Sequence, residues 1–304
     1  MCALRLSADR RELEVRGTPL FPCSAYLDEV GVGFPADVPW HWHPEIEAVT
    51  VAGGAAEVCI GGERRRVPAG GGFFCNRNVL HSLTALGEPP CTLHSLVFDP
   101  AIVAGAPESV FSRHYVRPLL ESRTLAGLFL DPEVDWHRAA MGHIEGVYGA
   151  MEAEQPGYEF AVRTHLSALW LTILEHSREP LPDPIPYTRE TERVKQMISY
   201  IRDNLARRLT VGDIAAQASI CVRECQRCFE KTLHQSPTAY VLHARLTKAA
   251  ELLVSTALPV TDIAMETGFS SPSYFSKLFR ERFGVSPSDY RAERAGEGPR
   301  QSAT

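Results

Sequence analysis

Two different spacings of apolar residues divide the chain into a β-rich part and a helical part. In residues 1–107, short runs of alternating apolar residues are broken by glycine, proline and asparagine, which is typical of β-sandwiches and barrels. From residue 108 onward such breaks are rarer, and apolar residues recur every three or four positions, which predicts helices. The predicted fold class is therefore α+β, with more than one domain.

Two helices are predicted in residues 108–177. The first covers residues 134–153 and stops before Gln155-Pro156-Gly157. The second has one apolar face, composed of Val162, Leu166, Leu169, Trp170 and Ile173. An amphipathic face must be covered, but its partner can be the barrel of the same chain or a second copy in a homodimer. Residues 178–191, with four prolines, are predicted to be a linker.

The C-terminal helical part contains one pattern twice. Asp213-Ile214-Ala215 recurs 49 residues later as Asp262-Ile263-Ala264, and Ser236-Pro237-x-x-Tyr240 recurs 50 residues later, at Ser286. Each copy fits a short helix, a turn and a second helix, the pattern of a helix-turn-helix. Apolar residues at 242, 246, 249 and 253 predict that one helix joins the copies. Its length of ~27 Å is near the ~34 Å between successive major-groove faces of DNA.

The second copy has the clearer local signals. Gly268 supplies a turn residue that tolerates positive φ, and Ser271-Pro272 supplies an N-cap hydroxyl and a first-turn proline. The side chains expected to face the core are Phe275, Leu278 and Phe279. The DNA-contacting residues predicted from the second helix of each copy are Arg223, Glu224, Gln226, Arg227, Ser273, Tyr274, Ser276, Lys277 and Arg280.

At these residues the chain resembles the AraC/XylS family of bacterial transcription regulators. The run GFSSPSYFSKLFRERFGVSPSDYR carries the likeness, which extends over residues 192–294 and includes the turn glycine, the Ser-Pro caps and the closing tyrosine. The resemblance implies a cytoplasmic, sequence-specific DNA-binding regulator with two helix-turn-helix units. Its implied partners are double-stranded DNA, a small-molecule effector and RNA polymerase, with no membrane. A helical bundle without a DNA role is the alternative.

Charge and cysteine usage agree with that expectation. The net charge is −6, yet residues 192–294 hold 15 basic and 11 acidic residues, and the remainder holds 16 and 26. No stretch has the pattern of a signal peptide or a membrane span. Eight cysteines without a secreted spacing are interpreted as reduced thiols, and residues 295–304 as a disordered tail.

The N-terminal part carries a second motif. His41-x-His43-x-x-x-Glu47 is followed by Pro68-x-Gly70 and by His81. These residues resemble the two-part motif of the cupin barrel, which the AraC/XylS family uses as its N-terminal domain. Because residues 41, 43 and 47 are all odd-numbered, they would share one face of a single strand, and His81 on a neighbouring strand would complete the set.

The cluster of His41, His43, Glu47 and His81 has three interpretations. It can line an effector pocket, hold a divalent transition metal, or form a hydrogen-bonded structural cluster. The late position of His81 is similar to the regulator form of the motif and favours effector binding without a metal or other cofactor. An enzyme is not expected, although a cupin metalloenzyme (an isomerase or a dioxygenase) and a ligand-independent regulator are the alternatives.

Cys221-x-x-x-Cys225-x-x-Cys228 has the spacing of an iron–sulfur site. The repeat argues against that interpretation, because Cys225 and Cys228 align with the apolar Phe275 and Leu278. The two cysteines are therefore predicted to be small core residues, and Cys221 to stand at an N-cap position without a good cap.

Overall fold

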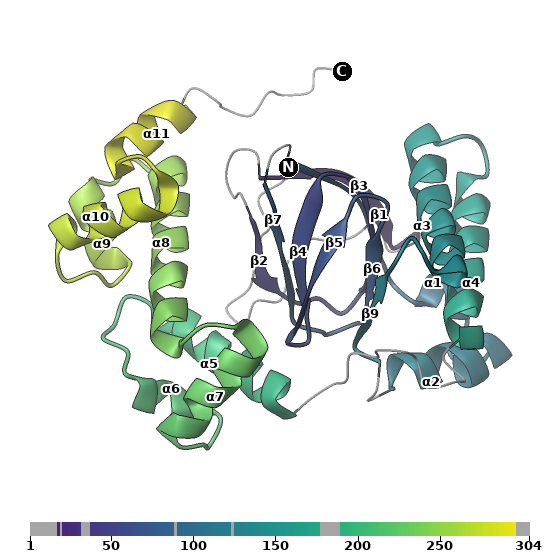
Figure 1. Cartoon of the computed structure of the whole chain (residues 1–304), viewed down its shortest axis with the longest axis horizontal. Helices are drawn as coiled ribbons and strands as arrows, with labels where there is room; N and C mark the ends of the chain where they lie inside the picture. The colour runs from purple at the N-terminus through teal and green to yellow at the C-terminus, as the bar shows by residue number, and fades with distance from the viewer. Residues whose placement is uncertain are drawn as a thin grey trace. The chain divides into compact units, whose positions relative to one another are not determined.

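The structure is a computed structural model, and it describes residues 17–18, 20–31, 37–87, 90–122, 125–176 and 189–295. These residues fall into two units that divide between Glu192 and Arg193. We call them the barrel unit and the reader unit, and Figure 1 labels their elements.

Two antiparallel sheets form the framework of the barrel unit (Figure 1). The first has the strand order β1 (Cys23–Val30), β8 (Cys91–Phe98), β3 (Ile46–Gly53), β6 (Gly72–Cys75) and β9 (Gly127–Leu130). The second has the order β2 (Asp37–His41), β7 (His81–Ala85), β4 (Ala55–Ile60) and β5 (Glu63–Pro68). The predicted β-rich fold is confirmed. Strand β9 pairs with β6, so the sheet extends past the boundary predicted at residue 107.

Successive side chains along the strands of the first sheet point to opposite faces and belong to two separate hydrophobic cores. Val49 of β3 and Phe73 of β6 point to the space between the sheets and pack in one cluster with residues of β4 and β7. Ala48 and Phe74, the next positions along each strand, pack in a second cluster on the opposite side. This is the period of two expected for a sheet buried on both faces.

Helices cover the outer face of the first sheet (Figure 1). In chain order they are α1 (Ala101–Ala104), the π-helical segment η1 (Phe111–Val116), α2 (Arg117–Leu120), α3 (Asp135–Ala153) and α4 (Tyr158–His176). Helix α3 begins one residue after the start of the predicted helix 134–153, and α4 contains all five residues of the second predicted apolar face.

The apolar face of α4 is buried within its own chain. Its five predicted residues are each at most 2 % exposed, and they pack in the same cluster as Ile144 of α3 and Phe74 of β6. The prediction of an apolar face is confirmed. The interpretation of this face as a dimer surface is wrong, because α3 and the sheet already cover it.

Seven helices of the reader unit are described, and the last six follow the predicted repeat. Their bounds are α5 (Arg189–Asp203), α6 (Val211–Gln217), α7 (Val222–Leu233), α8 (Pro237–Ser255), α9 (Val260–Glu266), α10 (Pro272–Phe283) and α11 (Pro287–Ala295). Helices α6 and α9 begin 49 residues apart, whereas α7 and α10 begin 50 residues apart, as the repeat requires. Helix α8, with 19 residues, spans ~28 Å between the two copies.

Two boundary predictions need correction. Helix α5 begins at Arg189, so residues 189–191 are helical and not part of a linker. Residues 178–188 of the predicted linker lie outside the described residues. Ala295, the first residue of the predicted tail, is the last residue of α11, and residues 296–304 also lie outside the described residues. No helix in the described ranges is long and apolar enough to cross a membrane.

Candidate functional site

Helices α9 and α10 form the second helix-turn-helix, and its turn depends on backbone geometry. Gly268 has φ +84°, and a Cβ at this position would stand 2.2 Å from the carbonyl oxygen of Leu205. The Oγ of Ser271 accepts a hydrogen bond from the N–H of Tyr274 at 3.3 Å and so caps α10. Phe275 and Phe279 are fully buried, as predicted, whereas Leu278, the third predicted core residue, is half-buried. The turn glycine, the serine N-cap and the buried apolar face together fix the orientation of α10 relative to α9.

Helices α6 and α7 repeat this arrangement with weaker local signals. Thr210 and Asp213 form a reciprocal capping box that starts α6. The turn residue is Ser219, which has φ +53° where the second copy has glycine. The α7 N-cap residue, Cys221, makes no side-chain capping bond, and the helix ends at His234 with φ +53°. The first copy therefore uses less suitable residues at three backbone positions.

Most predicted DNA-contacting side chains are accessible within the reader unit. The exposed ones are Arg223, Gln226, Arg227, Ser273, Tyr274, Lys277 and Arg280. Ser276 and Glu224 are half-buried. The accessible side chains lie on the sides of α7 and α10 that do not face the core, which is the placement required for contact with a DNA groove.

Glu224 is engaged inside the protein. Its Oε1 lies 2.7 Å from Nη2 of Arg227 and 3.3 Å from Nη1 of Arg193 on α5. This carboxylate connects α5 with α7 and orients the Arg227 guanidinium. Sequence reasoning missed Arg193, since its position 31 residues before Glu224 gives no local signal.

The three cysteines of α7 do not converge on a cluster site. Cys225 and Cys228 are completely buried and Cys221 is exposed. Burial raises the pKa of the Cys225 thiol to about 11, which keeps it protonated at neutral pH. The prediction that Cys225 and Cys228 are small core residues is confirmed.

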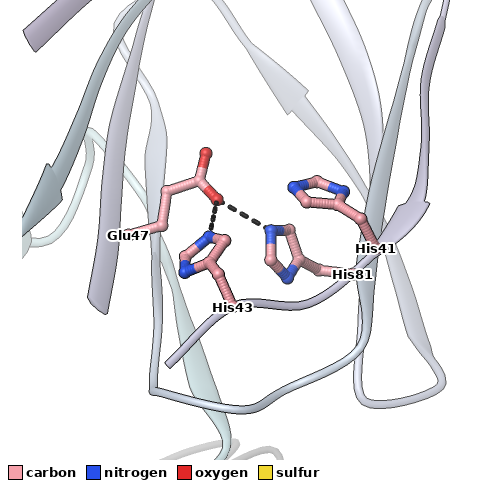
Figure 2. Close-up of side chains that lie close together, drawn as sticks. All are labelled: His41, His43, Glu47 and His81. Atoms are coloured by element: carbon pink, nitrogen blue, oxygen red, sulfur yellow. Dashed lines mark hydrogen bonds and ion pairs between the residues drawn. The ribbon is translucent and has the colours of Figure 1, made fainter. Parts of the chain in front are cut away.

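The barrel cluster is assembled from more elements than the sequence predicted. His41 is the last residue of β2, His43 lies in the connection that follows, and Glu47 is on β3 in the other sheet. The prediction of one strand carrying all three is therefore wrong. His81, the first residue of β7, pairs directly with His41. The four side chains still converge, and one ligand atom of each lies within 4.8 Å of the others (Figure 2).

Backbone carbonyl groups orient all three histidine rings. Nδ1 of His41 lies 2.8 Å from the carbonyl oxygen of Pro39, and Nδ1 of His81 lies 2.8 Å from that of Val79. Nδ1 of His43 lies 3.2 Å from the carbonyl oxygen of Glu45. A carbonyl oxygen only accepts, so each Nδ1 must carry the proton and donate it. The Nε2 atoms then remain available for the interior of the cluster.

The carboxylate of Glu47 faces two of these rings. Its Oε2 lies 3.3 Å from Nε2 of His43 and 2.7 Å from Nε2 of His81 (Figure 2). Nε2 of His81 is buried, and this close contact lies outside hydrogen-bonding geometry. The histidine side chains are only 3–5 % exposed and that of Glu47 14 %.

Burial and charge oppose each other in the cluster. Burial lowers the pKa of His41 well below its usual value, and the neighbouring His81 lowers it further. Burial alone would raise the pKa of Glu47, but His81 and His43 hold it well below its usual range. Burial alone would also lower the pKa of His81, but Cys75 and Glu47 raise it well above its usual value. The cluster therefore favours a negative carboxylate close to one positive charge.

Cys75 is a neighbour of the cluster that sequence reasoning missed. Its Sγ lies 3.5 Å from Nδ1 of His81, and its position on β6 pairs with Glu47 of β3. The only sequence signal is a cysteine at the end of a short apolar strand, six residues before the histidine. That signal becomes meaningful only when the strand register is known.

Two family models match the chain, one in each unit. A model of the AraC-like ligand binding domain matches residues 32–170, and a model of a helix-turn-helix domain matches residues 214–293. The first match includes the four cluster residues and the helices behind the sheet. The second includes both copies of the helix-turn-helix.

Three similar proteins match different shares of the chain. The HTH-type transcriptional regulator YdeC of Bacillus subtilis, whose function is uncharacterized, is 27% identical over 92% of this chain and 95% of its own length. The transcriptional activator RhaS of Klebsiella pneumoniae is 32% identical over 50% of this chain and 53% of its own. A crystal structure of an AraC-type regulator from Chromobacterium violaceum, 32% identical, covers 35% of this chain and 96% of its own, with a TM-score of 0.34.

Proposed function

The chain belongs to the AraC family of DNA-binding transcription regulators, and from this premise we propose a role for each unit. The reader unit binds two neighbouring major-groove segments of duplex DNA. The barrel unit binds a small effector at His41, His43, Glu47 and His81, and its occupancy controls the affinity for DNA. This function is preferred to a cupin metalloenzyme because both matched family models and the similar proteins are those of regulators.

The observation that carries the proposal is the duplicated helix-turn-helix joined by α8. Each copy presents polar side chains from its second helix, and the rigid connector spans ~28 Å. Successive major-groove faces on one side of B-DNA lie ~34 Å apart, which two recognition helices held by such a rod can approach together.

The two copies carry different chemistry toward DNA. Arg223, Gln226 and Arg227 on α7 are exposed, and their long side chains have donors suited to the edges of guanine and adenine. Lys277 on α10 is also exposed and suits a phosphate, since its ammonium group is a compact point charge on a flexible stem. We therefore assign most base discrimination to α7 and more of the phosphate contact to α10.

The first test measures DNA binding by residues 189–295 and by the full chain. Both should bind duplex DNA, and the observed affinity should fall steeply with salt because contacted phosphates release counterions. A segment that folds with the expected helix content but shows no salt-sensitive binding would exclude the central proposal.

The second test compares base preference among variants by binding-site selection. Arg227→Ala should relax the preference and cost ~1–3 kcal/mol on the selected site. Lys277→Ala should weaken binding to all sequences similarly and reduce the salt slope by about 1. Glu224→Gln separates orientation from contact, because it removes the negative charge that pairs with Arg227 and leaves the guanidinium itself. Unchanged base preference in both Arg223→Ala and Arg227→Ala would contradict the assignment.

The barrel part of the proposal rests on linkage. An effector changes DNA affinity only if it binds two states of the protein with different affinities. His43→Ala should therefore abolish the regulated change in expression of a reporter and leave DNA binding by the purified protein intact. If the reporter responds normally in this variant, the cluster is not the effector site.

RNA polymerase and a second copy of the chain complete the proposed set of partners. The buried face of α4 is not available to a second copy, but Phe160 and Leu171 on its other side are 77% and 55% exposed. These two side chains support a dimer surface there. Sedimentation of the Phe160→Glu variant should shift toward the monomer, and an unchanged mass distribution would exclude this surface.

A further inference from the structure

We propose that Arg193 is a positioning residue for base recognition by α7, although it lies on α5, outside both copies of the helix-turn-helix. It acts through Glu224, which pairs with both Arg193 and Arg227. By holding this carboxylate, Arg193 releases the Arg227 guanidinium for a base edge. The inference rests on the proposed function, because it concerns how α7 discriminates between DNA sequences.

The first argument is that two guanidinium groups share one carboxylate oxygen. Oε1 of Glu224 lies 2.7 Å from Nη2 of Arg227, three residues further along α7, and 3.3 Å from Nη1 of Arg193 on α5. Two positive charges and one negative charge leave the group of three with a net charge of +1. The carboxylate can therefore stay paired with one arginine while the other turns toward DNA.

The second argument is the difference in exposure among the three side chains. Those of Glu224 and Arg193 are 25% and 28% exposed, whereas that of Arg227 is 64% exposed. Arg227 is therefore the member that can reach a base edge, and Arg193 is the member that remains beside the carboxylate. A half-buried carboxylate has lost part of its hydration and is stabilised by a cation that stays in place.

The consequence appears when α7 binds DNA. A guanidinium that turns toward a guanine edge leaves the Glu224 carboxylate, and the DNA phosphates bring further negative charge close to it. With Arg193 in place, the carboxylate keeps one cation at 3.3 Å in the bound state. Without Arg193, Glu224 competes with the base for Arg227, so that the free energy of specific binding becomes less favourable.

The second copy has a different arrangement and provides an internal comparison. Tyr274 and Lys277 stand 50 residues after Glu224 and Arg227, at the equivalent positions of α10. Nζ of Lys277 lies 3.8 Å from Oε1 of Glu281 on the same helix, and these side chains are 72% and 57% exposed. An exposed pair of this kind contributes little energy. The cation of α10 is therefore held loosely, whereas that of α7 belongs to a half-buried network.

The experiment is a double-mutant cycle on the full chain. The wild type, Arg193→Gln, Glu224→Gln and the double variant are titrated with the DNA obtained by binding-site selection and with an unrelated duplex. Arg193→Gln should weaken binding to the selected DNA by about 5–30-fold and reduce its preference over the unrelated duplex. In the Glu224→Gln background the same substitution should change the affinity by less than about twofold, because the carboxylate charge is already gone.

The salt dependence separates positioning from direct contact with DNA. Removal of a phosphate-binding cation reduces the salt slope by about 1, so Arg193→Gln should leave the slope unchanged, unlike Lys277→Ala. Arg193→Lys should keep most of the base preference, because one ammonium group can replace the single contact of Nη1 with Oε1. Glu281→Gln is the matched control, since it removes the carboxylate of the exposed pair on α10 and should leave the base preference unchanged.

Three results would overturn the role of Arg193. They are an equal loss of affinity in both backgrounds, a salt slope reduced by about 1 in Arg193→Gln, and an unchanged base preference in that variant. Thermal unfolding followed by circular dichroism shows whether each variant folds, and Arg193→Met, which retains an aliphatic stem, gives the same cycle if Arg193→Gln does not. Each of these results leaves DNA binding by the wild type intact, whereas a wild-type chain that binds no duplex DNA would refute the proposed function and this role together.

Discussion

The N-cap of α7 can be compared directly with the equivalent N-cap of α10, and the comparison predicts the stability gained by a better cap. Cys221 has φ −77° and ψ 163°, an extended backbone suited to an N-cap, but its side chain makes no capping bond. The equivalent residue of the second copy, Ser271, accepts a hydrogen bond from Tyr274 N–H at 3.3 Å. Cys221→Ser therefore places a hydroxyl oxygen where it can accept from the N–H of Glu224, three residues into the helix.

The expected gain follows from the nature of the cap. A thiol is a weak acceptor, and replacing a good N-cap by a poor one typically costs ~1 kcal/mol. The bond of the second copy is rather long, so we expect Cys221→Ser to stabilise the reader unit by about 0.5–1 kcal/mol. For a domain of about 100 residues, this corresponds to an increase of about 2–8 °C in the unfolding temperature.

The second copy provides the reciprocal control. Ser271→Cys should destabilise the unit by a similar amount, and the double exchange should be nearly neutral, because the two caps lie on different helices. Thermal unfolding followed by circular dichroism gives the stability difference, and amide hydrogen exchange at Glu224 reports the new bond directly.

Two results would refute the reasoning. If Cys221→Ser leaves the unfolding temperature unchanged while Ser271→Cys lowers it, the α7 N-terminus is already satisfied by another group. If stability rises without slower exchange at Glu224, the gain has another source.

Three further predictions test the turn, the helical layer and a buried histidine. Gly268→Ala should destabilise the reader unit by more than ~2 kcal/mol in denaturant unfolding, because φ is +84° and the Cβ would meet the Leu205 carbonyl oxygen. Ser219→Gly, at the equivalent turn position, should be neutral or stabilising by up to ~1 kcal/mol. Leu166→Ala, in the completely buried face of α4, should cost ~2–5 kcal/mol in the barrel unit, and a loss below ~1 kcal/mol would contradict the packing. Burial lowers the pKa of His137, whose Nδ1 accepts from the N–H of Asp131 at 3.0 Å. Because the unfolded chain then binds a proton that the folded chain excludes, stability should fall as pH drops below ~6.5, and His137→Gln should reduce that slope.

Local signals predicted the helices of this protein closely. Helices α8 and α10 begin where a serine cap stands before a helical run, and the residues of α4 predicted to be apolar and inward-facing are all buried. A helix is specified by residues three and four positions apart and by its ends, so the necessary information lies in one short segment.

The strands were less predictable because their partners are distant in sequence. The spacing of His41, His43 and Glu47 suggested one strand, yet the chain leaves β2 after His41 and enters the other sheet at β3. Alternation gives the face of a residue only while the strand continues. Strand β9 escaped prediction for a related reason, since its four residues join the sheet only through pairing with β6.

The register of β3 and β6 connects the cluster to the helical layer. Glu47 of β3 pairs with Cys75 of β6 on the side of the cluster. The next pair, Ala48 and Phe74, points to the other side, where the Phe74 ring packs edge-on against Trp170 of α4 at 6.4 Å. Because adjacent residues share one backbone, an occupant that shifted the backbone at Glu47 would also shift Ala48, which packs in the same cluster as α4. The register of β3 and β6 therefore links the cluster, on one face of the sheet, to the packing of α4 on the other face.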